Sequence, residues 1–205
     1  MAEARRLPRG RHDLTREQVE DDQRLRILVG IAEAMADQGY VNTPVAEILR
    51  RSGVSRETFY RLFTDKLDGF LAAFDLVSEF LLAELAGAVA GPGEPFDRVE
   101  RAITAYLATI ASHRAYARLF LVEASAVGAV AIDRRQVVQQ RIVDQLVDVL
   151  DVGSEPARFS CQVVVSSVSA LIVAPLVADD PDAIVALGPS VVDHLRRLHA
   201  AGLLT

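Results

Sequence analysis

Residues 43–66 read TPVAEILRRSGVSRETFYRLFTDK, and this stretch predicts two short helices joined by a tight turn. Thr43 is a good helix N-cap, and Pro44 suits the first helical position, where the missing N–H of a proline costs nothing. Gly53 can adopt the left-handed conformation that ends a helix, and Ser55 can cap the next one. We therefore expect a helix, a glycine turn and a second helix.

The faces of these two helices indicate what the motif does. On the second helix, Phe59 and Phe63 are four residues apart, so they point the same way and away from solvent. The polar and basic side chains left outside are Arg56, Thr58, Tyr60 and Arg61. This organisation is that of a helix-turn-helix, which places its second helix in the major groove of DNA. An ordinary helical hairpin inside a core remains the alternative for the motif taken alone.

The residues around the motif resemble the DNA-binding domain of the TetR family of bacterial repressors, over roughly residues 24–75. The matching pieces are Arg26-Ile27-Leu28, Gly39-Tyr40, Thr43, Val45-Ala46-Glu47-Ile48, Ser52-Gly53-Val54-Ser55, Thr58-Phe59-Tyr60, Phe63, Lys66 and Phe70. Glu57 stands where the family usually has a small residue, and Leu62 where a histidine is common. The rest of the chain matches only in helical character and length. The resemblance implies a DNA-binding transcriptional repressor that forms a homodimer.

The charge of the chain is distributed unevenly. Residues 1–70 have 12 basic and 12 acidic side chains, whereas residues 71–205 have 10 basic and 16 acidic ones, which gives a net charge of −6. The basic residues of the first part cluster in 1–11 and 50–66, with mostly acidic residues at 13–37 between them. We therefore expect attraction to DNA only at the N-terminal arm and at the second helix of the motif.

Seven residues are predicted to contact DNA: Thr43, Ser55, Arg56, Thr58, Tyr60, Arg61 and Lys66. Arg56 and Thr58 lie at the N-terminal end of the second helix, which is where base contacts are made. Tyr60, Arg61, Lys66 and Thr43 are predicted to hold phosphates, a role that the resemblance implies for the tyrosine and the lysine.

The chain shows no sign of catalysis or of a cofactor. No glycine-rich phosphate loop or nucleophile signature is present, and the one cysteine and four histidines do not form a metal-ligand pattern. We expect no catalytic residue, no metal and no enzyme activity. Residues 1–26 lack the apolar run of a signal peptide, and a single cysteine suits a reducing cytoplasm, so a cytoplasmic location is expected.

The hydropathy pattern predicts an all-α protein with three parts. Residues 1–20 are predicted to be a flexible basic arm, residues 21–66 the helix-turn-helix DNA-binding domain, and residues 67–205 a helical ligand-binding and dimerisation domain. The first helix should run from Asp21 or Asp22 to Gly39, and a long helix should begin at Lys66. This long helix should extend to about residue 90. Further helices are expected at about 96–111, 115–127, 131–150, 159–178 and 182–200, the last one kinked or divided at Gly188-Pro189.

Residues 159–178 contain no charged side chain, and this uncharged stretch is long enough for a membrane span. Serines and Pro175 interrupt the stretch, so a buried helix covered by a partner chain is preferred, and no membrane contact is expected. Together with the last helix it should form a four-helix interface in a homodimer. The proposed central positions are Val164, Val168, Leu171, Leu195 and Leu198.

The second half is also predicted to bind a small apolar or weakly polar effector between its helices. The proposed lining residues are Phe74, Tyr106, Phe120, Glu123 and Ile142. Glu123 could orient a ligand, or it could be exposed or paired with Arg118. The favoured function is a repressor that a ligand releases from a palindromic, double-stranded operator. The alternative is an all-helical binding protein or enzyme with an incidental helix-turn-helix.

Overall fold

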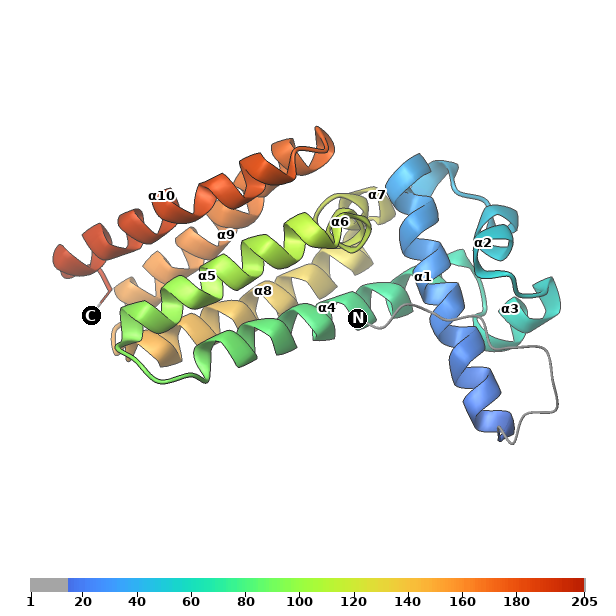
Figure 1. Ribbon diagram of the computed structural model, residues 1–205, viewed down its shortest axis with the longest axis horizontal. Coiled ribbons are helices and arrows are strands. Elements are labelled where there is room, and N and C mark those ends of the chain that lie inside the picture. Colours follow the sequence, from blue (N-terminus) through green and yellow to red (C-terminus); the bar gives the residue numbers. More distant parts are fainter. Residues whose placement is uncertain (1–14, 205) are drawn as a thin grey trace.

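The computed structural model describes residues 15–204, which fold into helices and short connections without any strand. The elements are α1 (Arg16–Asn42), α2 (Val45–Ser52), α3 (Arg56–Leu62), α4 (Lys66–Val89), α5 (Pro95–Ser112), α6 (Arg114–Arg118), the π-helical turn η1 (Leu119–Glu123), α7 (Ala124–Val127), α8 (Ala129–Leu150), α9 (Glu155–Val177) and α10 (Pro181–Ala200). Figure 1 shows α1–α3 grouped at one end of an elongated bundle. The predicted all-α fold is confirmed.

The first helix begins earlier than predicted. Thr15 caps α1 through a capping box, in which its hydroxyl accepts from the Gln18 N–H (3.2 Å) and its own N–H donates to the Gln18 side chain (2.9 Å). Residues 16–20, predicted to belong to the flexible arm, are therefore the first turn of α1. The remainder of the predicted arm, residues 1–14, lies outside the described residues.

Large apolar side chains fill the space between α1, α3 and the start of α4. The predicted stripe of α1 is buried, with Ile27, Ile31 and Met35 fully enclosed. Phe59 and Phe63 of α3 are buried, and Gly69 of α4 packs against Ile31 and Phe59. These contacts hold α3 in place from its inner side and leave its outer side free.

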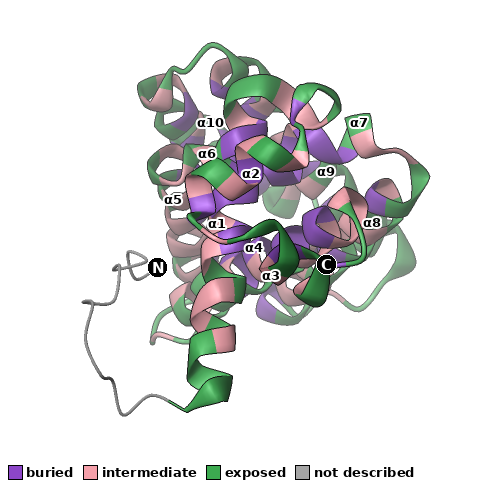
Figure 2. Ribbon diagram, turned by 90° about the vertical axis from the view of Figure 1, so that its right-hand side faces the viewer, coloured by how far each residue is buried: buried purple, intermediate pink, exposed green. Residues whose placement is uncertain are grey.

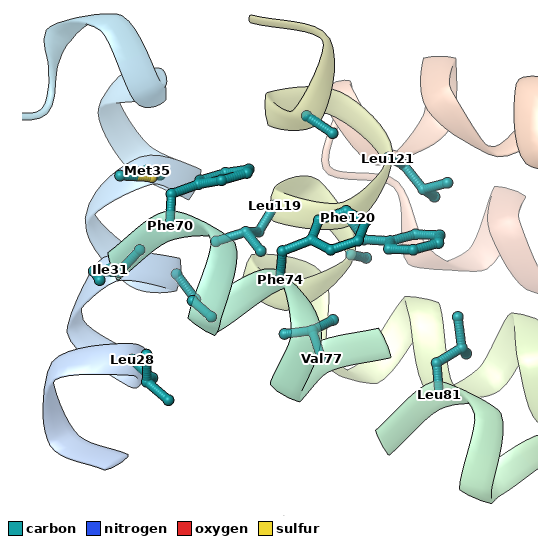
Figure 3. Close-up of a cluster of buried hydrophobic side chains, with 14 of the residues drawn as sticks. Leu28, Ile31, Met35, Phe70, Phe74, Val77, Leu81, Leu119, Phe120 and Leu121 are labelled. Atoms are coloured by element: carbon teal, nitrogen blue, oxygen red, sulfur yellow. The ribbon is translucent and has the colours of Figure 1, made fainter. Parts of the chain in front are cut away.

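The long helix α4 connects this unit to the bundle. It starts beside α1 and runs to the far end of the molecule (Figure 1), with an N-cap in which Asp65 accepts from the Asp68 N–H at 2.8 Å. Phe74 on α4 stacks on Phe120 with ring centroids 5.2 Å apart. Figure 3 shows these two rings beside Leu119 and Val77, close to the α1 side chains Ile31 and Met35. Solid packing therefore occupies the middle of the molecule.

The helix predicted at 115–127 is divided into α6, η1 and α7. The π-helical turn η1 (Leu119–Glu123) has one extra residue per turn, and it buries Leu119, Phe120, Leu121 and Glu123. A π-helical turn changes the direction of the side chains that follow it. The sequence contains no signal for this change, because propensity and periodicity alone do not distinguish it from an α-helical turn.

The last two helices lie along one side of the bundle (Figure 1). α10 continues through Gly188 and Pro189 as one helix, so of the predicted kink or division the division is wrong. Gly188 is buried against α5, where an added Cβ would make ordinary contact with Leu107 Cδ1 at 3.5 Å. Packing against α5 accompanies the continuous course of α10 through the proline.

One face of α9 is uncovered and, beyond Arg158, uncharged. The helix is long and apolar enough to cross a membrane by length and composition, yet only 28% of its most apolar window is buried. Phe159, Val163 and Leu171 are about half exposed or more, and they lie on the outer face (Figure 2 shows how burial is distributed over the elements). The inner face holds the single cysteine, Cys161, which is fully buried.

Two of the proposed dimer positions are wrong. Val164 and Leu195 are buried inside the protomer, where they pack in one cluster with Cys161. Leu171 is exposed and remains available to a partner chain. A helix with no charged side chain over residues 159–177 gives only a weak sequence signal of which side faces its own protomer, here the exposed Gln162, Ser166 and Ser167.

Candidate nucleic-acid interface and ligand cavity

The turn between α2 and α3 has the geometry that the sequence predicts. Gly53 adopts the left-handed conformation (φ 66°, ψ 26°), and its N–H bonds to the Leu49 carbonyl, ending α2. Ser55 then caps α3 by accepting from the Thr58 N–H at 3.0 Å. The cap of α2 differs from the prediction, since Pro44 occupies the N-cap position without a side-chain hydrogen bond.

The outer face of α3 is open and polar. Ser55, Arg56 and Tyr60 are exposed, and Thr58 is half-buried. No hydrogen bond or ion pair within residues 15–204 holds the Arg56 guanidinium, so its five donors are free for a ligand. Glu57 is also exposed on this helix, which puts one negative charge beside them.

The other arginines of the motif are held by carboxylates. Arg61 donates to Glu20 at 2.6 Å and to the Gln23 side chain at 3.0 Å, both on α1. Arg50 and Arg51 both bond Glu47 at 2.7 Å, and these bonds lower the pKa of Glu47 to about 2. The basic cluster at 50–66 is therefore largely neutralised, and Arg56 is the cation that remains unpaired on this surface.

Two predicted phosphate contacts are not exposed for that role. Thr43 is fully buried, and its hydroxyl donates towards the Gly39 carbonyl (2.7 Å) and the Ala34 carbonyl (3.3 Å). Lys66 donates to the carbonyls of Tyr40 (2.7 Å) and Thr43 (3.1 Å), and burial lowers its pKa. Both side chains close the C-terminal end of α1, so the prediction for Thr43 is wrong and Lys66 has at most one donor to spare.

Tyr40, Lys66 and Glu123 form what we call the Tyr40 junction. Gly39 interrupts α1 with φ 76° and ψ 159°, a conformation open to glycine, and this turns the Tyr40 N–H out of the helix. That N–H donates to Glu123 Oε2 at 2.7 Å, while the Tyr40 carbonyl accepts from Lys66. The Tyr40 ring also lies 4.2 Å below the Lys66 ammonium. One residue of α1 is thus bonded to both η1 and α4.

Sequence reasoning did not find this junction. Glu123 is buried, so it is neither exposed nor paired with Arg118, and it does not face a ligand cavity. The bond joins residues 83 positions apart and depends on the backbone angle of Gly39. The Gly39-Tyr40 pair was the one available signal of a helix interruption.

A cavity of about 90 Å³ lies between α4, α5, α8, α9 and α10, at the end of the bundle far from α3. Valines dominate its wall, and its polar side chains are Tyr106, Gln145 and Ser169. Tyr106 and Ile142 of the predicted set lie in this wall. Phe74 and Phe120 do not, because they stack on each other in the solid core nearer to α1 (Figure 3).

A sequence profile of the bacterial regulatory proteins of the tetR family matches residues 27–73, which span most of α1 to the first turns of α4. The match covers the turn at Gly53, the cap at Ser55 and the junction residues Tyr40 and Lys66. Residues 27–73 therefore carry the DNA-binding domain of the TetR family. No curated protein matches the chain in sequence.

This chain is also similar in fold to solved structures of TetR-like regulators, and the similarity includes the helical half that follows residue 73. A TetR-like regulator from Rhodococcus sp. RHA1 superposes with a TM-score of 0.67 at 17% identity, covering 96% of this chain and 100% of that one. A regulator from Chloroflexus aurantiacus gives 0.72 at 14% identity, with 87% and 96% covered. FadR from Bacillus subtilis, in complex with stearoyl-CoA, gives 0.70 at 16% identity, with 82% and 95% covered. At these identities the likeness establishes the fold alone.

Within residues 15–204, no group of three or more His, Cys, Asp or Glu side chains is arranged to hold a metal ion. The two features with an evident capacity to bind are therefore the outer face of α3 and the cavity of the bundle. They lie at opposite ends of α4, with the Tyr40 junction at its start.

Proposed function

We propose that the protein is a homodimeric repressor that binds a palindromic DNA operator through α3 and leaves it when a small molecule occupies the bundle cavity. The observation that supports this best is the outer face of α3, where Arg56 is exposed and unpaired beside Thr58 and Tyr60. An arginine at the N-terminal end of a recognition helix can make a bidentate contact with a guanine. Acting on DNA would place the protein in the cytoplasm.

The DNA contacts proposed from the structure are fewer than those from the sequence. Ser55, Arg56, Thr58 and Tyr60 remain, since each has a side chain on the open face of α3. Arg61 is kept as a phosphate contact that must exchange its bond with Glu20 for one with DNA. Lys66 acts indirectly in this proposal, by holding the end of α1 to α4.

The proposed dimer uses the uncovered face of α9. Phe159, Val163 and Leu171 lie along this face, and charged side chains are absent between Arg158 and Asp179. Gln162, Ser166 and Ser167 are exposed between them, so the face is uncharged and carries large apolar side chains. Exposed apolar side chains grouped in this way favour association with another protein surface. A second copy related by a two-fold axis would present the same face, and it would set the spacing of two α3 helices at about 34–36 Å, one turn of DNA.

The proposed signal travels along α4. Its last turns contribute Leu85 and Val89 to the cavity wall, and its first residue, Lys66, caps α1 at the Tyr40 junction. A ligand that prefers a displaced α4 would shift the DNA-binding unit and change the spacing of the two α3 helices. The stearoyl-CoA complex of FadR, a protein of the same fold, supports an apolar molecule as the ligand.

The test is binding to DNA from upstream of the protein's own gene, measured by fluorescence anisotropy against a scrambled duplex. Arg56→Ala should lose about 1–3 kcal/mol of discrimination between the two duplexes, the value of a bidentate base contact. Arg50→Ala is the matched control, since it removes the same charge from an arginine that Glu47 already holds. Equal discrimination by wild type and Arg56→Ala would reject the assignment of α3.

A further inference from the structure

The first turns of α1 lie beside α3, on the side where α3 ends (Figure 1). Glu20 and Gln23 face α3, because both bond the guanidinium of Arg61. Arg24 points to the same side of α1, since its guanidinium lies over the ring of Phe63, 4.8 Å from the centroid. Phe63 is the residue that ends α3. The start of α1 and the end of α3 therefore form one surface, which we call the α1–α3 edge.

Arg24 is a cation of this edge that is free to bind a ligand. Its side chain is exposed, and within residues 15–204 neither a hydrogen bond nor an ion pair holds it. Stacking on Phe63 uses the flat face of the guanidinium, whereas the N–H donors lie around its rim. Phe63 is buried, so the ring gives the arginine a fixed support. The cation is thus held in position with its donors unused.

The acidic residues of α1 do not neutralise Arg24. Glu20 is already bonded to Arg61, and Asp22 accepts from another arginine of α1 at 2.9 Å. Asp21 precedes Arg24 by three residues, a spacing that permits pairing on a helix, but no ion pair joins these two described residues. The exposed Asp21 still lowers the local positive potential. An anion must therefore be held here by direct contact rather than by the general charge of the surface.

Arg61 differs from Arg24 in this respect. In the protein without DNA, Arg61 donates to Glu20 at 2.6 Å and to Gln23 at 3.0 Å. A ligand must displace the carboxylate before it can bind Arg61, whereas Arg24 can bind at once. Of the two arginines at the α1–α3 edge, Arg24 is the one that is ready to bind an anion.

We propose that the α1–α3 edge binds the DNA backbone, with Arg24 donating hydrogen bonds to a phosphate beside the groove that α3 enters. This rests on the proposed function in taking α3 as the helix that reads the major groove. The groove is about 12 Å wide and is bordered by phosphates on both sides. Base contacts come from the N-terminal end of a recognition helix, and Arg24 lies at the other end of α3 and on the neighbouring helix. A planar guanidinium matches two phosphate oxygens, so the backbone is the group that Arg24 fits.

The test uses Arg24→Met in the full-length protein. Methionine keeps a long apolar side chain over Phe63 and has a helix propensity close to that of arginine, but it has no charge and no donor. Binding to the upstream duplex and to its scrambled version is measured by fluorescence anisotropy between about 50 and 200 mM salt. We expect both affinities to fall about tenfold at low salt, the effect of one charge-assisted hydrogen bond. The slope of log K against log salt should decrease in magnitude by about 0.9, the value of one phosphate contact.

Two further variants separate a phosphate contact from a packing role. Arg24→Lys keeps the charge, so it should restore the salt slope of the wild type on both duplexes. Arg197→Met is the matched control, since it removes the same charge from an exposed arginine on α10 that is paired with Asp193. It should change neither slope nor affinity. An unchanged slope in Arg24→Met, or a changed slope that lysine does not restore, would overturn the proposal.

The two duplexes distinguish this inference from the repressor proposal. A loss confined to the upstream duplex would make Arg24 a base contact and would overturn its assignment to the backbone. Selective binding that does not depend on Arg24 would also reject the assignment and leave the repressor proposal standing. Equal binding of both duplexes, weakened in Arg24→Met and restored in Arg24→Lys, would support the α1–α3 edge and reject an operator-specific repressor.

Discussion

The DNA-binding unit α1–α3 and the bundle α4–α10 are each stabilised by a different kind of contact. In the first, caps and bonded carbonyls fix the helix ends, as at Thr15, Ser55 and Lys66, and phenylalanines fill the interior. In the second, valines, leucines and alanines fill much of the interior, while directional bonds such as the Arg141–Glu79 ion pair and the Asp180 cap lie at its surface. This interior leaves a cavity of about 90 Å³ and an uncovered face on α9. Directional contacts specify one geometry, whereas generic apolar contacts leave room for a ligand and a partner.

The largest effect is expected on the uncovered face of α9. Leu171→Asp would place a charge in the centre of the proposed dimer interface, where it would be buried without a partner. We expect the variant to have the mass of one 22.3 kDa chain by light scattering, while the wild type has twice that mass. Val41→Asp, at an exposed valine on α1 in the DNA-binding unit, should remain dimeric. A monomeric wild type would show that α9 is not the interface.

The bond between the two regions can be removed at Glu123. Glu123→Ala leaves the Tyr40 N–H without its acceptor, and an unpaired buried donor costs about 1–3 kcal/mol. We expect a lower urea midpoint and, if the junction is the main connection, separate transitions of the two regions. Glu84→Ala, an exposed glutamate on α4, serves as the control and should be within about 0.5 kcal/mol of wild type. Equal midpoints for the two variants would show that the junction contributes nothing.

The difference in packing can be tested by enlarging one residue in each region. In Gly30→Ala the new Cβ would lie 3.2 Å from Ser52 N and 3.3 Å from the Ile48 carbonyl oxygen, so overpacking of about 1–3 kcal/mol should exceed the gain of about 1 kcal/mol in helix propensity. Ala102→Val extends into the cavity and should stabilise the protein by about 0.5–2 kcal/mol. Chemical denaturation measures both. Changes of the same sign would contradict the comparison.

The smallest effect is expected at the surface of the DNA-binding unit. Bonds from Arg50 and Arg51 lower the pKa of Glu47 from 4.5 to about 2, so its ionised form is favoured by folding. Its contribution is complete above pH 4.5 and is lost as the pH falls towards 2. As the pH falls from 4.5 towards 2, the urea midpoint of Glu47→Gln should therefore decrease less than that of the wild type. An unchanged acid response, matching that of Glu84→Gln, would show that the bonds are not stabilising.

The predictable parts of the structure are those with short-range signals. Gly53 and Ser55 each mark a helix end within a few residues, and their geometry agrees with the prediction. The capping box of Thr15 and Gln18 has an equally local signal, which was missed because the surrounding residues are polar. Local signals of this kind define the helix-turn-helix almost completely.

The parts that were missed depend on contacts distant in sequence. Thr43 and Lys66 match the family pattern, yet the chain uses them to close α1 rather than to present them to DNA. The partner of Glu123 lies in another helix, and the direction of the α9 faces is set by which neighbours pack there. The sequence marks these choices only weakly, since every side of α9 is uncharged beyond Arg158 and only Gln162 and a few serines distinguish the outer one.

The rate at which the fully buried Cys161 thiol reacts can report how often the bundle opens locally. It is the only thiol in the chain, and burial raises its pKa, so the reactive thiolate is both scarce and shielded in the folded protein. An alkylating reagent can modify it only when α9 separates from its neighbours, and the labelling rate then reports the free energy of that local opening. Because Cys161 packs in the same cluster as the cavity residue Val164, an occupied cavity should slow the labelling, which makes the thiol a native reporter of ligand binding that needs no added fluorophore.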